Sequence, residues 1–96
     1  MENYISLDAT IIALQELRYT PSGLPIIEMT VEHNSKQMEC KLERIACFQI
    51  LSKIIGDLAL DKYQVGEKVH IRGFLTASNQ RSSKLMLHVQ EITHIE

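Results

Sequence analysis

Apolar and polar residues alternate along most of this chain, and an α-helix cannot bury a pattern with a period of two on one face. The alternation runs through residues 5–11, 27–33, 38–43, 69–76 and 85–90. Because successive side chains of a strand point to opposite faces of a sheet, each run predicts a half-buried strand. The pattern therefore predicts a protein built mainly from five short strands.

Turn-forming residues separate these runs. Residues 20–25 hold two prolines and a glycine, which end a strand. Asn34-Ser35-Lys36 predicts a short hairpin turn, and residues 78–83 predict a polar loop before the last strand. The phase of the first run changes at Ile11-Ile12, which predicts a bulge that bends this strand. Gly73, in the middle of a run, permits the sharp coiling that a small barrel needs.

One segment has a different period. Ile50, Ile54 and Leu58 recur every four residues, which predicts a short amphipathic helix over roughly residues 48–60. Three strands, a helix and two strands is the element order of an OB-fold. We therefore expect an all-β fold, a five-stranded Greek-key OB-fold barrel with one short helix between strands three and four, as a single domain of residues 1–96. An α+β sandwich of another topology is the alternative.

Composition limits the partners and the compartment. The net charge of −2 argues against nucleic-acid binding, because phosphate affinity comes mainly from Lys and Arg; any such binding needs a local basic patch. Cys40 and Cys47 are too few for a disulfide framework and predict free thiols in a reducing compartment. Met1-Glu2-Asn3 carries no basic leader, and no apolar run reaches the roughly 18 residues of a membrane span. We therefore expect a cytoplasmic protein that does not enter a membrane.

Several segments resemble one family. Tyr19–Pro25 and Val31–Ser35 resemble the first hairpin of the PriB family (primosomal replication protein N), a branch of the bacterial single-strand-binding OB-fold superfamily. Val69–Leu75 resembles its fourth strand and Lys84–Val89 its fifth. The resemblance implies a non-catalytic replication-restart accessory protein of the primosome. It also implies a homodimer that binds single-stranded DNA and contacts the primosomal helicase PriA and other primosome proteins. Glu39 stands near the position where this family often has an aromatic side chain.

An OB barrel binds oligonucleotides across its second and third strands, between the loops that join strands one and two and strands four and five. Binding needs cations along the phosphate path and flat side chains under the bases. The expected contacts with single-stranded DNA are Arg18, Tyr19, Lys36, Lys41, Arg81 and Lys84. Phe74 faces outward beside Arg72, so we expect it either to stack on a base or to be covered in a dimer interface or by the helix.

Other residues support a different function. Four glutamates share the outward parity of the second and third expected strands and would repel phosphate: Glu28, Glu32, Glu39 and Glu43. An OB-fold protein–protein interaction module with weak or no DNA binding is therefore the alternative function. The sequence has no P-loop, no nucleophile elbow and no Cys/His spacing typical of zinc sites. We expect no catalytic activity, no metal and no cofactor.

Overall fold

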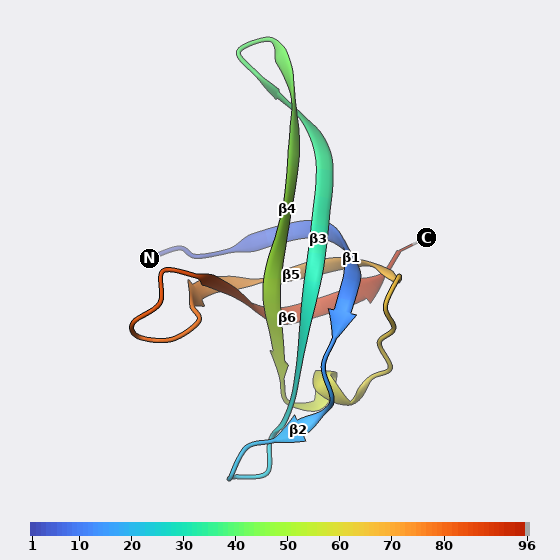
Figure 1. Ribbon diagram of the computed structural model, residues 1–96, viewed down its shortest axis with the longest axis vertical. Coiled ribbons are helices and arrows are strands. Elements are labelled where there is room, and N and C mark those ends of the chain that lie inside the picture. The colour runs from blue at the N-terminus through green and yellow to red at the C-terminus, as the bar shows by residue number, and fades with distance from the viewer. Residues whose placement is uncertain (96) are drawn as a thin grey trace.

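The computed structural model describes residues 1–95, and Glu96, the last residue of the expected domain, lies outside the described residues. Within residues 1–95 the chain forms six strands and one 3-10 turn (Figure 1). The elements are β1 (Ile5–Leu14), β2 (Arg18–Tyr19), β3 (Pro25–Glu39), β4 (Leu42–Ile55), η1 (Asp57–Leu60), β5 (Lys68–Ala77) and β6 (Leu85–His94). None of the helical segments within this range is long and apolar enough to cross a membrane.

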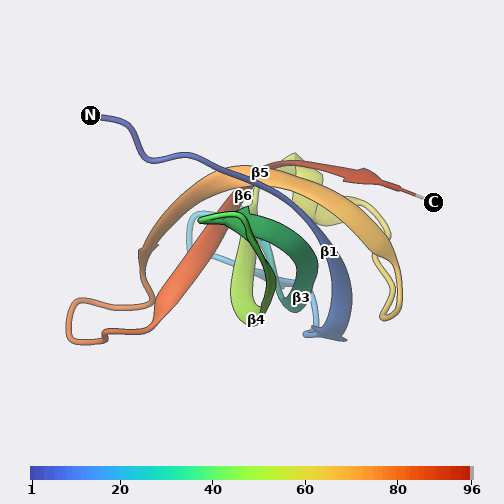
Figure 2. The same ribbon diagram turned by 90° about the horizontal axis from the view of Figure 1, so that it is seen from above.

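The sheet closes on itself as a barrel. Its strand order is β1-β5-β6-β4-β3-β2, and an additional pairing of β1 with β3 closes a ring of five strands that leaves β2 outside. The pairing of β4 with β6 is parallel, whereas the other pairings are antiparallel. This is the connectivity of the OB-fold, which the alternation predicted, and it excludes the α+β sandwich. The two-residue strand β2 is an addition to the five predicted strands and pairs only with the start of β3. Figure 2 shows the strands curving around the barrel.

Two irregularities allow the sheet to close. The first half of β1 pairs with β5 and its second half with β3, and the register shifts between Ile11 and Ala13. This confirms the bulge predicted from the change of phase. The second lies between Arg72 and Gly73, where the pairing of β5 with β6 shifts. A Cβ atom on Gly73 would lie 1.9 Å from the carbonyl oxygen of His88, so only glycine permits this approach of the two strands.

The inward faces of the strands form one apolar core. The large hydrophobic side chains with no exposure to solvent are Ile11, Met29, Val31, Ile54, Val69, Ile71 and Leu87. All follow the alternation of their strands, as expected for every one except Ile54, which was assigned to the helix. Burial of such a side chain contributes roughly 1.5–3 kcal/mol to folding. Tyr63 is also part of this core, and its hydroxyl donates a hydrogen bond to the carbonyl oxygen of Leu58 (2.6 Å). Burial, and then the charges of Asp61 and Glu67, raise the pKa of Tyr63 to about 12.

The helix expected over residues 48–60 is mostly wrong. Residues up to 55 belong to β4, and only Asp57–Leu60 turn, as the 3-10 segment η1. A spacing of four also fits a strand, because Ile50 and Ile54 lie on one face with Ser52 between them; Ser52 is fully buried in the core. Pairing with β3 along the whole of β4 outweighs the local preference, and β-branched residues favour it.

The hairpin turn expected at Asn34-Ser35-Lys36 is also wrong. Strand β3 continues to Glu39, and the turn consists of Cys40 and Lys41, with φ angles of 51° and 63°. Positive φ at both positions of a two-residue turn is typical of type I′, which matches the twist of a hairpin. Paired residues 34–47, here called the arm, project beyond the barrel along the long axis of the molecule (Figure 1).

Candidate nucleic-acid interface

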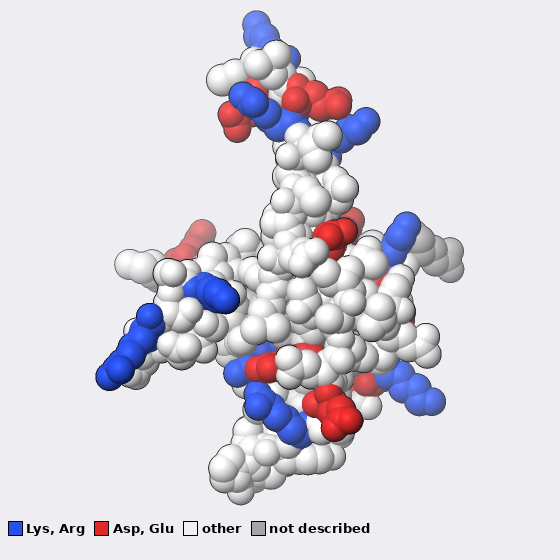
Figure 3. Space-filling model, in the orientation of Figure 1, with Lys and Arg blue, Asp and Glu red and all other residues white. Residues whose placement is uncertain are grey.

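The loop between β5 and β6 carries two exposed cations, Arg81 and Lys84. Its own polar side chains hold the backbone: Asn79 Oδ1 accepts from the amide of Arg81, and Ser82 Oγ accepts from the amide of Lys84, both at 2.9 Å. The amide of Ser78 donates to the carbonyl oxygen of Lys84 and closes the loop. Among residues 1–95, neither cation forms an ion pair. Basic side chains extend from this side of the barrel in Figure 3.

Arg18 and Tyr19 form β2, beside the start of β3. Arg18 Nη2 lies 3.1 Å from Glu28 Oε1, and Lys53 Nζ lies 3.6 Å from the same oxygen. One carboxylate therefore holds two cations and leaves a net positive charge on this part of the outer face. Tyr19 is exposed, and the turn that follows is held by Thr20 Oγ1, which accepts from the amide of Leu24 (3.0 Å).

The arm holds the other two expected cations. Lys36 lies in the middle of the arm and pairs with Glu43 at 3.9 Å. Lys41 was expected on the outward face of a strand, but it lies at the tip of the hairpin turn, because β3 runs past the predicted turn. The arm thus places Lys41 far from the β5–β6 loop along the longest dimension of the molecule (Figure 1).

The four glutamates are not the uniform acidic face that the sequence predicted. Glu39 ends β3, so its odd number places it on the face opposite to Glu28 and Glu32, where it approaches Arg44 (3.9 Å). Glu32 accepts a hydrogen bond from Gln49 (3.1 Å), and the other two carboxylates pair with cations. Their repulsion of phosphate is therefore reduced by local partners.

Phe74 and Arg72 lie on the outer face of β5. The ring of Phe74 stacks on His88 of β6, with centroids 5.0 Å apart and planes at 16°. This stack covers one side of Phe74; its expected contact with a base or with a second copy stays a prediction. Burial, and then the charge of Lys53, lower the pKa of His88. Arg72 lies 3.7 Å from Glu91.

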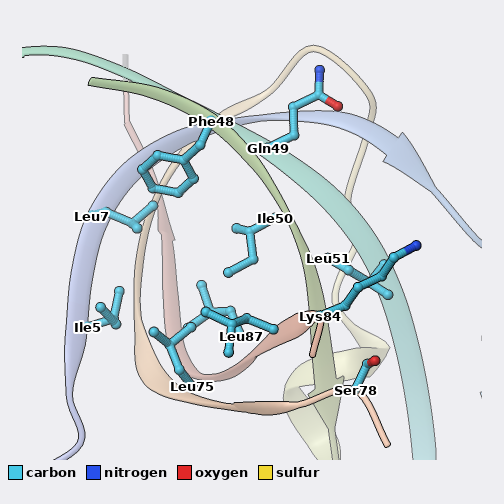
Figure 4. Close-up of a pocket in the computed structure, with 11 residues that line it drawn as sticks. Ile5, Leu7, Phe48, Gln49, Ile50, Leu51, Leu75, Ser78, Lys84 and Leu87 are labelled. Carbon is cyan, nitrogen blue, oxygen red and sulfur yellow. The ribbon is translucent and has the colours of Figure 1, made fainter. Parts of the chain in front are cut away.

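Sequence reasoning missed an apolar cavity at one end of the barrel. Phe48 of β4 and Lys84 both line it (Figure 4). Phe48 was placed at the start of the mistaken helix, although its even number aligns it with Ile50 and Ile54. Read as a strand, that alternation would have placed Phe48 on the inward face of β4, together with Ile50 and Ile54. In residues 1–95, no three His, Cys, Asp or Glu side chains lie close enough together to hold a metal ion.

Comparison with known proteins agrees with this geometry. The model of a family described as "Another single-strand binding protein family" matches residues 3–91. Replication restart protein PriB of Neisseria meningitidis serogroup B is 35% identical over 91 residues, which cover 94% of this chain and 91% of that protein. The solved structure of PriB from Ralstonia solanacearum is 28% identical, with a TM-score of 0.88 and 100% of both chains covered. The small single-stranded DNA-binding protein from Streptomyces coelicolor is 14% identical, has a TM-score of 0.76 with 99% and 95% covered, and shares the fold.

The barrel topology and the matching family model define the class: a small OB-fold of the single-strand-binding type. A sequence identity above 30% over nearly the whole chain identifies the family within this class. The chain belongs to the family of replication restart protein PriB. The resemblance first noted in its hairpin and last two strands is thereby confirmed.

Proposed function

We propose that this protein is a non-catalytic component of the primosome that binds single-stranded DNA during replication restart. Membership of the PriB family supports the role. The observation that carries the binding mechanism is the β5–β6 loop, whose cations Arg81 and Lys84 have no carboxylate partner among the described residues. Free cations on an ordered loop attract phosphate at little conformational cost.

In this mechanism the DNA backbone follows the cations and the bases meet flat side chains. Arg81 and Lys84 contact phosphates on one side of the barrel, and Arg18 with Tyr19 contacts the strand on the other. Lys36 and Lys41 extend the path along the arm. Little base recognition is expected, because these groups contact the phosphates and the faces of the bases, and these features are similar in all nucleotides.

We further propose that two copies form a homodimer in the cytoplasm and contact the primosomal helicase PriA. Two linked sites raise the apparent affinity for a long strand without any new contact. The outer face of β5, with Phe74 and Arg72, is the candidate for this dimer interface.

A catalytic role is not proposed, although one chain of side chains has the order of a hydrolytic relay. Ser6 Oγ lies 3.0 Å from His70 Nε2, and His70 Nδ1 lies 2.6 Å from Asp8 Oδ1. The side chains of Asp8 and His70 are 66% and 32% exposed, on the outer surface of two paired strands. Water at such a surface weakens the electrostatic stabilisation on which catalysis depends.

Fluorescence anisotropy with labelled oligo-dT across a salt series tests the binding proposal. Replacing both Arg81 and Lys84 by Ala should weaken binding and reduce the salt slope by about 1.4, because each single-strand phosphate contact contributes about 0.7. The control replaces Lys68, the first residue of β5, and Lys62, in the connection before it, and should leave the slope unchanged. An unchanged slope in the loop variant would remove both residues from the interface.

A second candidate function is protein binding through the arm. Met38, Leu42 and Ile45 of the arm are 69%, 59% and 71% exposed, so the arm offers apolar surface to a partner. A pure protein-binding module predicts no measurable binding to oligo-dT even at low salt, so the same titration separates the two functions.

A further inference from the structure

The arm leaves the barrel as a ribbon of only two strands. Toward the arm, the pairing of β1 with β3 ends at Thr10 and Glu32. Beyond that point, within residues 1–95, residues 33–39 of β3 pair only with β4. A two-stranded hairpin is at best marginally stable on its own in water. A further contact at the root of the arm is therefore needed to fix its direction.

His33 bridges the point where β1 and β3 separate. If the register of the two strands continued, Ala9 would pair with His33. Instead, the side chain of His33 crosses the gap, and its Nδ1 lies 2.6 Å from the carbonyl oxygen of Asp8. A carbonyl oxygen only accepts, so Nδ1 carries the proton and donates. The imidazole thus replaces a backbone hydrogen bond of the strand ladder that has ended.

The hydrogen bonds continue from His33 into the arm. Because Nδ1 carries the proton, Nε2 of the neutral ring accepts from the hydroxyl of Ser35, at 2.7 Å. Ser35 Oγ in turn accepts from Nε2 of Gln37, at 2.9 Å. These three residues are two apart in β3, so their side chains lie on one face of the arm. They form a single chain of donors that ends on the barrel, and bonds in such a chain strengthen one another.

Neighbouring strands hold both ends of the His33 contact. Phe48 pairs with His33 across β3 and β4, and the two ring centroids lie 5.2 Å apart. On the barrel side, His70 Nδ1 of β5 lies 2.6 Å from Asp8 Oδ1, which fixes the residue that accepts from His33. The contact therefore connects the arm to two strands of the barrel, β1 directly and β5 through Asp8.

We propose that His33 is a positioning residue that, together with Ser35 and Gln37, holds the arm in one direction relative to the barrel. The consequence for binding rests on the proposed function, in which Lys36 and Lys41 extend the DNA path along the arm. A strand of DNA that spans the barrel and the arm meets both cations only when the arm points along that path. An arm that is already fixed lowers the entropy cost of this binding.

Distances between spin labels test the direction of the arm. One label is attached to Cys40 at the tip of the arm and the other to Ser22→Cys, in the turn after β2 at the opposite end of the molecule (Figure 1). Cys47→Ser removes the other native thiol. Double electron–electron resonance on labelled chains diluted with unlabelled protein then measures the distance within one chain.

The chain with His33 should give one narrow distance distribution. His33→Ala should lose it, whereas His33→Asn, whose shorter side chain still has an amide donor for the carbonyl oxygen of Asp8, should keep it. Ser35→Ala removes the next link and should broaden the distances less. The control is His94→Ala, which removes a histidine that lies 2.6 Å from Glu67 on the barrel, and should change nothing. Equal widths in His33→Ala and the unchanged chain, or equal broadening in the control, would overturn the proposal.

Oligonucleotide length separates this proposal from the proposed function. His33→Ala should weaken binding of oligo-dT of about 15 nucleotides about two- to fivefold and leave binding of about 5 nucleotides unchanged. An equal loss at both lengths would overturn the link between the arm and the DNA path. No binding of either oligonucleotide by the unchanged protein would overturn the proposed function, while the label distances would still decide whether His33 holds the arm.

Discussion

Gly73 is the position where one added methyl group should do most damage to the barrel. The Cβ of an alanine there would lie 1.9 Å from the carbonyl oxygen of His88 and 2.9 Å from its carbonyl carbon. Both atoms are backbone, so no side chain can rotate away. Strands β5 and β6 must separate by about 1.5 Å to restore an ordinary contact of 3.4 Å.

The cost follows from that separation. Overpacking costs about 1–3 kcal/mol, and each weakened hydrogen bond of the strand ladder adds about 1 kcal/mol. We therefore expect Gly73→Ala to lower the free energy of unfolding by about 3–4 kcal/mol. A domain of this length has a total of roughly 5–14 kcal/mol. The melting temperature should fall by about 15–30 °C.

Thermal and urea unfolding followed by circular dichroism measure this effect. Gly66→Ala is the control: Gly66 has a φ of +96° but no atom within 4 Å of an added Cβ, so that variant carries backbone strain without a clash. It should cost only about 1 kcal/mol. If Gly73→Ala lost no more stability than Gly66→Ala, the close approach of β5 to β6 would be refuted.

Three further predictions concern the core, the outer face and the arm. Ser52 Oγ is buried without a hydrogen-bond partner among the described residues, so Ser52→Ala should raise the free energy of unfolding by about 1 kcal/mol in urea titrations; a loss would reveal a partner for the hydroxyl. Burial lowers the pKa of His88 below 6.5, so as pH falls the unfolded chain binds that proton before the folded chain does. Stability should therefore decline as pH falls below about 6.5, and less steeply in His88→Gln; equal slopes would contradict this assignment. Replacing Cys40-Lys41 by Asn-Gly suits the positive φ angles and should slow hydrogen exchange in the arm about fivefold, without moving the exchange of the barrel core.

The positions of several candidate site residues could be predicted without coordinates, because loop residues follow from where strands end. Arg18 begins β2, Lys84 directly precedes β6 and Arg81 lies in the loop between β5 and β6, close to where turn-forming residues placed them. Lys36 and Lys41 could not be placed, since no Asn-Gly or similar signal marks the true turn. Phe48 was missed because a spacing of four residues fits both one face of a helix and one face of a strand. In a strand, residues i and i+4 also point to the same side.

Local pattern alone determined where β1 bends and most of the buried side chains of β1, β3, β5 and β6, because both depend on periodicity. It also marked position 73 as a place for sharp coiling, but the reason that only glycine fits there is the nearby backbone of β6, which is a tertiary contact. The length of the arm, the fate of residues 48–55 and the cavity at one end of the barrel were decided only by tertiary structure. All three have the same physical cause. Strands β3 and β4 gain backbone hydrogen bonds and cross-strand contacts by pairing along their whole length. Those contacts join residues that are too far apart in the chain for a local sequence pattern to predict.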